Sequence, residues 1–255
     1  MSEQRVVMIT GATSGIGYQT ALAFSAHGDL VVGTGRDQER LAALAEHVDL
    51  ALTMDVTDPI SVQAACAALL GRYGRVDVLV LNAGQGHFAG TLETSAAEIL
   101  ELMDVNLLGA HRVTQQLLPA MLQAKSGVIL PVSSVAGLRA YPRHGAYCAT
   151  KHALIGWAEA LRCELLGTGV DVSVICPPAV DTPFFVNAGY MTFKEDHEGL
   201  ELMSAEQVGA YIVQAARERP RIRVLGARAR LLEGLNRVAP GALEWVRRKS
   251  GKIGV

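Results

Sequence analysis

The chain has 255 residues, half of them hydrophobic, and a formal net charge of −2. A chain of this length and composition can bury one large core, and its balanced charge argues against nucleic acid as a partner. No apolar run approaches the roughly 18 residues that a membrane-spanning helix needs, and the first residues lack the layout of a signal peptide. The four cysteines form no Cys-x-x-Cys pair. We therefore expect reduced thiols that bind no metal, in a cytoplasmic protein.

Short apolar, β-branched runs alternate with longer helical patterns along the chain. Strands are predicted at 5–10, 30–35, 50–56, 76–82, 128–133, 170–176 and 221–226. Helices are predicted at 15–27, 37–47, 58–72, 95–125, 147–167 and 204–219. This alternation, without a linker or repeat, predicts one α/β domain over residues 1–255: a single doubly wound parallel sheet with helices on both faces. Such a sheet binds ligands at the carboxyl ends of its strands.

The first predicted strand ends in a glycine-rich loop that leads into a helix. Glycines at Gly-x-x-x-Gly-x-Gly spacing allow a tight turn, so that backbone N–H groups and the positive helix end can face a pyrophosphate. A purely structural turn is the alternative. The residues assigned to cofactor binding in this loop are Gly11, Thr13, Ser14, Gly15, Ile16 and Gly17.

The second predicted strand ends in Gly35 and Arg36. Proteins that bind NAD usually place an acidic residue here, on the ribose 2′-hydroxyl, whereas an arginine accommodates a 2′-phosphate. A guanidinium can hold that phosphate with two hydrogen bonds. Arg36 therefore favours NADP(H) over NAD(H), unless it is only a solvated arginine at a strand end.

Tyr147 and Lys151 lie four residues apart on one predicted helix. Their side chains share a helix face, and an ammonium near a phenol lowers the pKa of that phenol. The pair could therefore move a proton, but the pattern is too common to establish this alone.

Together, the glycine loop, Tyr147 and Lys151 resemble the short-chain dehydrogenase/reductase family, in its shorter branch, along nearly the whole chain. Ser134 lies thirteen residues before Tyr147, which is the usual interval in the family. Other family motifs follow in order: Asp55-Val56, Asn82-Ala83-Gly84, Asn106, Ser133-Ser134 and Pro177 to Thr182. The resemblance implies a Rossmann fold, a nicotinamide cofactor, a small-molecule substrate and a homodimer or homotetramer.

The resemblance also implies a catalytic role for four residues. Tyr147 would be the general acid or base, and Ser134 would donate to the substrate oxygen. Lys151 would lower the pKa of Tyr147 and hold the nicotinamide ribose, and Asn106 would orient a water that resupplies protons. Serine and asparagine side chains often serve only to hydrogen-bond the backbone. The assignment of Ser134 and Asn106 therefore rests on their spacing relative to the other family motifs.

Further cofactor contacts are implied in the same way. Residues expected to border the adenine, the ribose and the nicotinamide end are, in turn, Asp55 and Val56; Asn82, Ala83 and Gly84; and Pro177, Val180 and Thr182. The chain has Pro178 where the family usually has glycine, which leaves the path of this loop open.

In the family, the segment after Thr182 is a substrate lid, here residues 181–203. It is rich in aromatic residues, and Phe184, Phe185 and Tyr190 are candidate substrate contacts. An aromatic lid favours an apolar substrate, although these rings could instead seal the core or a subunit contact. His144, one turn before Tyr147, is a further candidate, with a rim position as the alternative.

The C-terminal tail, residues 227–255, is basic and amphipathic. From residue 221 to the end, nine lysines and arginines stand against two glutamates. Such tails resemble those of steroid- and retinol-active members of the family. A docked helix with a solvated basic face is the favoured interpretation, and contact with an anionic membrane surface is the alternative.

The sequence thus predicts an NADP(H)-dependent oxidoreductase that acts on an apolar carbonyl or secondary alcohol. An NAD(H)-dependent alcohol or steroid dehydrogenase is one alternative. A nucleotide-sensing protein without turnover is another, because fold alone does not establish activity.

Overall fold

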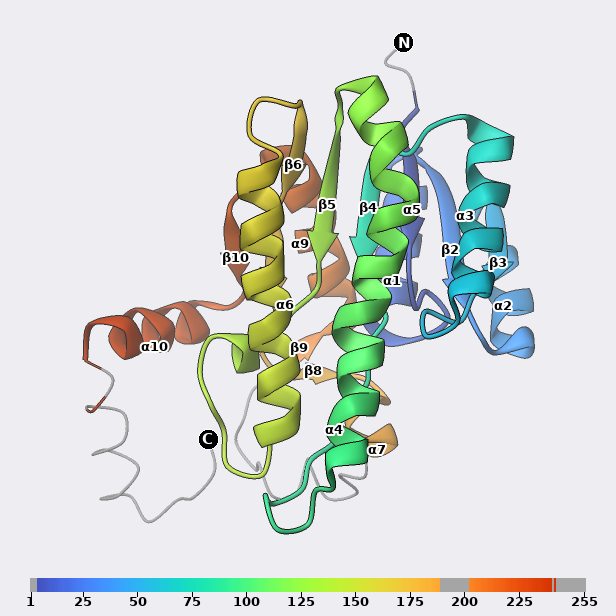
Figure 1. The fold of residues 1–255 in the computed structure, drawn as a ribbon. Coiled ribbons are helices and arrows are strands. Elements are labelled where there is room, and N and C mark those ends of the chain that lie inside the picture. Colours follow the sequence, from blue (N-terminus) through green and yellow to red (C-terminus); the bar gives the residue numbers. More distant parts are fainter. Residues whose placement is uncertain (1–3, 189–201, 240, 242–255) are drawn as a thin grey trace.

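A parallel β-sheet forms the centre of the computed structural model, which describes residues 4–188, 202–239 and 241. Six strands lie side by side in the order β3-β2-β1-β4-β5-β6, and every neighbouring pair is parallel (Figure 1). Their bounds are β1 (Val6–Ile9), β2 (Leu30–Gly35), β3 (Leu50–Thr53), β4 (Val78–Leu81), β5 (Gly127–Pro131) and β6 (Val170–Val172). The strand order reverses between β1 and β4, where a doubly wound sheet binds its ligand.

The strand predicted at 170–176 is divided at Ser173. Its second part, β7 (Val174–Cys176), pairs in parallel with β10 (Ile222–Val224), and a bridge between Val132 and Ile175 joins it to the chain after β5. The backbone N–H of Ser173 still donates to the carbonyl of Ile129, so the division is local. A short parallel pair, β8 (Val180–Asp181) with β9 (Met203–Ser204), lies beyond the carboxyl ends of the strands and was not predicted.

Helices cover both faces of the sheet, which confirms the predicted fold class. One face carries α1 (Gly15–Ala26), α2 (Gln38–Ala45) and α9 (Ala205–Glu218). The other carries α3 (Pro59–Tyr73), α5 (Gly109–Ala124) and α6 (Gly145–Glu164). The side chain of Asp58 caps the start of α3, and Gly74 ends that helix with a left-handed backbone, as favoured caps do.

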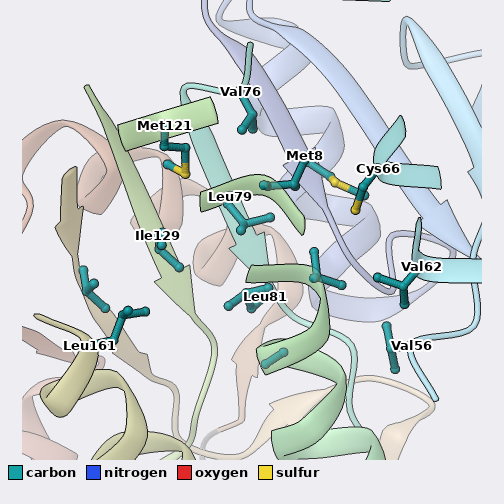
Figure 2. Close-up of a cluster of buried hydrophobic side chains, with 14 of the residues drawn as sticks. Met8, Val56, Val62, Cys66, Val76, Leu79, Leu81, Met121, Ile129 and Leu161 are labelled. Carbon is teal, nitrogen blue, oxygen red and sulfur yellow. The ribbon is translucent and has the colours of Figure 1, made fainter. Parts of the chain in front are cut away.

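Alternating side chains of the strands build two separate cores. In β1, Val7 faces the α1 side, whereas Met8 faces the α3 and α5 side. Figure 2 shows Met8 and Leu79 from neighbouring strands beneath Met121 of α5. Each of these side chains is fully buried, and such burial stabilises the fold by about 1.5–3 kcal/mol per side chain.

The prediction of one continuous helix at 95–125 is wrong in the middle of that segment. The structure has α4 (Ala96–Met103), a π-helical turn η1 (Asp104–Leu108) and then α5. A π turn of this kind is a single-turn bulge inside an α-helix and is frequent at functional sites. Its middle residue here is Asn106.

Three further helical segments are the 3₁₀ turn η2 (Val135–Gly137), the single turn α7 (Phe184–Asn187) and α10 (Ala227–Val238). The predicted lid and tail are described only in part, because residues 189–201, 240 and 242–255 lie outside the described ranges. Within those ranges, no helix has the length and apolar character needed to cross a bilayer, and no three potential metal ligands cluster.

Candidate active site

A cavity of about 2020 Å³ runs along the carboxyl ends of the strands. Its walls come from the β1–α1 loop, the ends of β2 to β5, the start of α6, the β7–α7 segment and α10. Of the predicted site residues, the cavity is lined by Gly11, Thr13, Ser14, Gly15, Ile16, Arg36, Asp55, Val56, Asn82, Ala83, Gly84, Ser134, His144, Tyr147, Lys151, Pro177, Val180, Thr182, Phe184 and Phe185. Gly17 and Asn106 lie behind the wall, and Tyr190 is outside the described residues.

The glycine loop needs its glycines for two physical reasons. Gly11 and Gly15 have positive φ angles of 64° and 53°, which other residues adopt only at a cost. Gly17 has no such angle, but a Cβ there would lie 2.2 Å from the carbonyl oxygen of Gly11. Ser14 precedes α1 without a side-chain cap, and the first turn of α1 holds no acidic residue. The first N–H groups of this helix therefore face the cavity as an anion site that fits a pyrophosphate.

The glycine loop is tied to the end of β4 by reciprocal hydrogen bonds. Thr10 Oγ1 accepts from the backbone N–H groups of Asn82 and Ala83, at 3.0 and 2.9 Å. In return, Asn82 Nδ2 donates to the carbonyls of Thr10 and Gly11, at 3.0 and 3.1 Å. The side chain of Asn82 is therefore used to fix the loop.

The adenosine end of the cavity carries an exposed ion pair. Arg36 Nη1 lies 3.3 Å from Asp55 Oδ2, and the Arg36 side chain is 60% exposed. Burial opposes the charge on Asp55, but hydrogen bonds from Thr57 and Arg36 outweigh burial and lower its pKa. Because this contact is long and solvated, it holds the guanidinium only weakly, and Arg36 can still turn to a phosphate.

Tyr147, in the first turn of α6, is only 8% exposed and faces the cavity. Burial raises its pKa, and a hydrogen bond with Ser134 partly offsets that rise. Ser134 is held in turn by the N–H of Ala136, which donates to its Oγ at 3.1 Å. The structure thus brings together the hydroxyl groups of two predicted catalytic residues.

Lys151 lies one turn further along α6 and is buried beside Tyr147. Its Nζ is 5.7 Å from the centre of the Tyr147 ring and donates to the carbonyl of Val132 at 3.0 Å. Burial lowers the pKa of Lys151 to about 8. The sequence predicted that Lys151 lowers the pKa of Tyr147, but burial controls both groups and moves the phenol's pKa the other way. The spacing could not show this, because the shift depends on tertiary burial.

Asn106 is presented by the π turn η1 and is 1% exposed. Its Oδ1 accepts from the N–H of Gln85 at 2.7 Å, and its Nδ2 donates to the Gln85 carbonyl and to Thr150 Oγ1. A Cβ on Gly84 would lie 3.1 Å from Asn106 Oδ1 and 3.4 Å from Lys151 Nζ. Asn106 therefore fixes the loop after β4 close to the lysine.

An aromatic group walls the part of the cavity next to Tyr147. Phe88 lies at its centre, with ring centres 5.5 Å from Tyr147, 5.6 Å from Phe185 and 4.4 Å from His144. Phe184 closes the group, 5.7 Å from Tyr147. The sequence analysis missed Phe88; its signal is a single aromatic in the glycine-rich stretch that follows Asn82-Ala83-Gly84.

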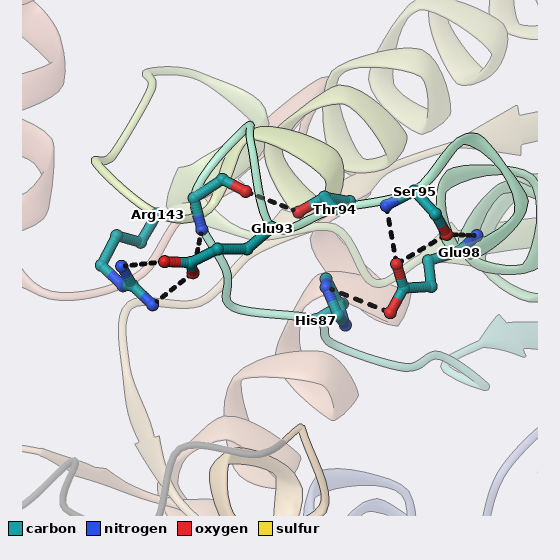
Figure 3. A network of polar contacts seen from close by, with 7 residues as sticks. His87, Glu93, Thr94, Ser95, Glu98 and Arg143 are labelled. Atoms are coloured by element: carbon teal, nitrogen blue, oxygen red, sulfur yellow. Dashed lines mark hydrogen bonds and ion pairs between the residues drawn. The ribbon is translucent and has the colours of Figure 1, made fainter.

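Exposed ion pairs brace the rim of this wall (Figure 3). Arg143 donates to both carboxylate oxygens of Glu93, at 2.8 and 3.4 Å, and so ties the loop before α6 to the loop before α4. Ser95 and Glu98 form a capping box at the start of α4, and the hydrogen bonds from Ser95 lower the pKa of Glu98. His87 lies 3.7 Å from Glu98. The two loops that present Phe88 and His144 are therefore held to each other.

The loop that contains Pro178 crosses the cavity and ends against the glycine loop. The Pro177 carbonyl accepts from the N–H of Val135 at 2.9 Å, which anchors the loop before Pro178. The side chain of Thr182 would lie 3.2 Å from a Cβ on Gly15. With Pro178 in place, the chain therefore still brings Thr182 against the start of α1.

A glycine loop, an uncapped helix start and a strand reversal at β1 and β4 together form the site of a dinucleotide-binding protein. Residues 5–191 match the model of the short chain dehydrogenase family. Dehydrogenase/reductase SDR family member 7B of Danio rerio is 36% identical over 198 residues, which cover 73% of this chain and 64% of that relative. The chain therefore belongs to the short-chain dehydrogenase/reductase family, although it spans less than two-thirds of this relative's length.

Solved structures of similar fold hold different nicotinamide cofactors. A short-chain dehydrogenase from Streptomyces avermitilis is 31% identical, with a TM-score of 0.81 over 98% of this chain and 99% of that one. A 3-ketoacyl-(acyl-carrier-protein) reductase from Brucella melitensis, complexed with NADH, is 28% identical, with a TM-score of 0.82 over 89% of this chain and 99% of that one. A variant of actinorhodin polyketide ketoreductase, with NADPH, is 29% identical, with a TM-score of 0.79 over 88% of this chain and 95% of that one.

Proposed function

We propose that this protein is a cytoplasmic, NADP(H)-dependent oxidoreductase that interconverts an apolar ketone or aldehyde and the corresponding alcohol. One observation carries the proposal: the hydroxyl groups of Ser134 and Tyr147 meet beside buried Lys151, in the cavity that the glycine loop also lines. Each group has a role in hydride transfer, and their joint position is hard to explain by packing alone.

The nicotinamide, when bound, supplies or accepts the hydride. In the reducing direction, Tyr147 holds its proton on Oη at neutral pH because burial raises its pKa, and it can pass that proton to the substrate oxygen. Ser134 Oγ donates to the same oxygen and stabilises the charge that develops there. Lys151, whose pKa is about 8, is mostly cationic at pH 7 and favours the phenolate that proton transfer leaves.

Arg36 supports the preference for NADP(H). The fold accepts both cofactor types in its neighbours, so the choice depends on the residues at the end of β2. Gly35 offers no carboxylate to a 2′-hydroxyl, while exposed Arg36 and Arg40 both line the cavity there. Asp55 and Asp37 also line the cavity there, but they contact Arg36 and Arg40 only through long, exposed ion pairs of 3.3 and 3.4 Å.

The aromatic wall supports an apolar substrate. Phe88, Phe184 and Phe185 bury ring surface beside Tyr147, and excluding water there favours proton and hydride transfer. Two neighbours are ketoreductases by name, which supports a carbonyl as the reacting group. Leu100 of α4 and Leu108 of η1 are exposed, which supports a homodimer or homotetramer joined through this region.

The test is a scan of NADPH and NADH oxidation against a panel of ketones and aldehydes, with wild-type protein and Tyr147→Phe. We expect wild-type turnover with NADPH, and a loss of at least about 100-fold in kcat for the variant. Binding of NADPH, followed by its fluorescence, should be retained by the variant. Near-normal turnover of Tyr147→Phe would refute the assignment. NADPH binding without turnover of any carbonyl by the wild type would instead support the nucleotide-sensing alternative.

A further inference from the structure

Arg139 lines the substrate part of the cavity from the segment between η2 and α6. It is partly buried, and its backbone N–H donates to the carbonyl of Val135. The guanidinium carbon lies 4.8 Å from the centre of the Tyr141 ring, and Nε donates to Tyr141 Oη at 2.6 Å. Stacking and this hydrogen bond fix the plane of the guanidinium, and they leave both terminal nitrogens available.

The charge of Arg139 has no acidic partner among residues 4–188, 202–239 and 241. The nearby rim arginine, Arg143, differs because it is paired with Glu93. A cation that is partly buried and unpaired in a cavity wall favours an anion from elsewhere. Arg228, at the start of α10, lines the same cavity and likewise has no acidic partner within those residues.

A continuous row of rings connects Arg139 with the reacting end of the cavity. Tyr141 lies 5.9 Å from His144, which lies 4.4 Å from Phe88, which lies 5.5 Å from Tyr147. The wall is thus apolar beside the catalytic hydroxyl groups and cationic at its far end. A purely apolar substrate would leave that cation without a partner.

We propose that the substrate is amphipathic: its carbonyl or alcohol carbon sits at Tyr147, its apolar chain lies along the Phe88 row, and an oxyanion at its other end is bound by Arg139. The two terminal nitrogens of the guanidinium can donate side by side to a carboxylate or a phosphate. This inference rests on the proposed function: it keeps the apolar body of the proposed substrate beside Tyr147 and adds an anionic group at the far end.

The test uses sets of three ketones of equal chain length, which end in a methyl group, a carboxylate or a phosphate monoester. For wild-type protein, we expect kcat/KM to be about 10- to 100-fold higher for at least one anionic member than for the neutral ketone. Arg139→Met should remove that preference by raising KM for the anionic ketone, with kcat nearly unchanged, because this contact is remote from the reacting carbon. Turnover of the neutral ketone should stay the same in the variant, which also shows that the variant is folded.

The control is the double variant Glu93→Gln with Arg143→Met, which removes a neighbouring arginine together with its partner and leaves the net charge unchanged. It should keep the preference for the anionic ketone. Equal wild-type kcat/KM for all three end groups would overturn the proposal, as would an Arg139→Met effect that is equal for neutral and anionic ketones. Failure of every ketone to react would instead refute the proposed function.

Discussion

Replacing Lys151 by methionine should abolish turnover and at the same time stabilise the folded protein. Burial lowers the pKa of Lys151 from its ordinary value of 10.5 to about 8. The gap between these values corresponds to about 3 kcal/mol against the charged lysine in the folded state. Methionine has a similar length and no charge, but it loses the hydrogen bond to the Val132 carbonyl, worth about 1 kcal/mol. The net gain at pH 7 is therefore about 2 kcal/mol, or about 4 to 8 °C in Tm for a chain of this size.

The stability that Lys151→Met gains over wild type should decrease as pH rises. Between pH 8 and 10.5 the unfolded chain binds more protons at this lysine than the folded protein does, so wild-type stability rises with pH in that window. The advantage of Lys151→Met should therefore be full below pH 8 and vanish as pH approaches 10.5. Urea denaturation of both proteins from pH 7 to 10 measures this difference. A variant that is less stable than wild type at pH 7, or a difference that is constant with pH, would refute the reasoning. Lys125→Met, at an exposed lysine, is the control and should change stability at pH 7 only slightly.

Two further substitutions test the cofactor end of the cavity. Gly17→Ala should weaken NADPH binding at least tenfold and lower Tm, because its Cβ would lie 2.2 Å from a backbone oxygen. Gly71→Ala, where a Cβ meets nothing within 4 Å, is its control and should stabilise α3 by up to about 1 kcal/mol. Gly35→Asp alone should impair binding of both cofactors, because its Cβ would lie 2.4 Å from Thr13 Cγ2. Adding Thr13→Ala removes that atom, and the double variant should shift the kcat/KM ratio toward NADH by about tenfold or more. Retained NADPH preference in the double variant, or normal NADPH binding by Gly17→Ala, would contradict these expectations.

The sheet was predictable from sequence because its strands are short apolar runs separated by helical patterns. Residues 78–81 are apolar without alternation, since both faces of the strand are buried. The glycine loop was predictable for a related reason, since its spacing follows from backbone geometry within one short segment. Patterns of this kind lie within one short segment, so they can be recognised without knowledge of tertiary contacts.

The π turn at Asp104–Leu108 was not predictable, because its five residues contain no glycine or proline and continue the helical pattern. It exists because Asn106 reaches the backbone of Gln85, twenty-one residues away. Pro119 shows the opposite case: it lies inside α5 without ending the helix. In both places a tertiary arrangement overrides the local preference.

The candidate site was predictable in its chemistry but not in its electrostatics. Ser134, Tyr147 and Lys151 were found through the family resemblance that their spacing supports. The directions of the pKa shifts of Tyr147 and Lys151 follow from burial, which spacing does not contain. Phe88 was missed because a single aromatic in a loop carries no periodicity. The isolation of Arg139 from carboxylates likewise emerges only when the chain is folded.

The walls of the cavity come from different parts of the chain, and this division has an evolutionary consequence. Most of the proposed dinucleotide contacts lie within residues 11–84, and the hydroxyl groups proposed to react belong to Ser134 and Tyr147. In contrast, α7 and α10, which line the same cavity, come from the last third of the sequence. The family match ends at residue 191, before α10 begins. Divergence after that point could therefore change which molecules the cavity accepts while the residues proposed for hydride transfer stay the same. Grafting the last third from a sister protein onto this chain is the corresponding route to transplanting selectivity.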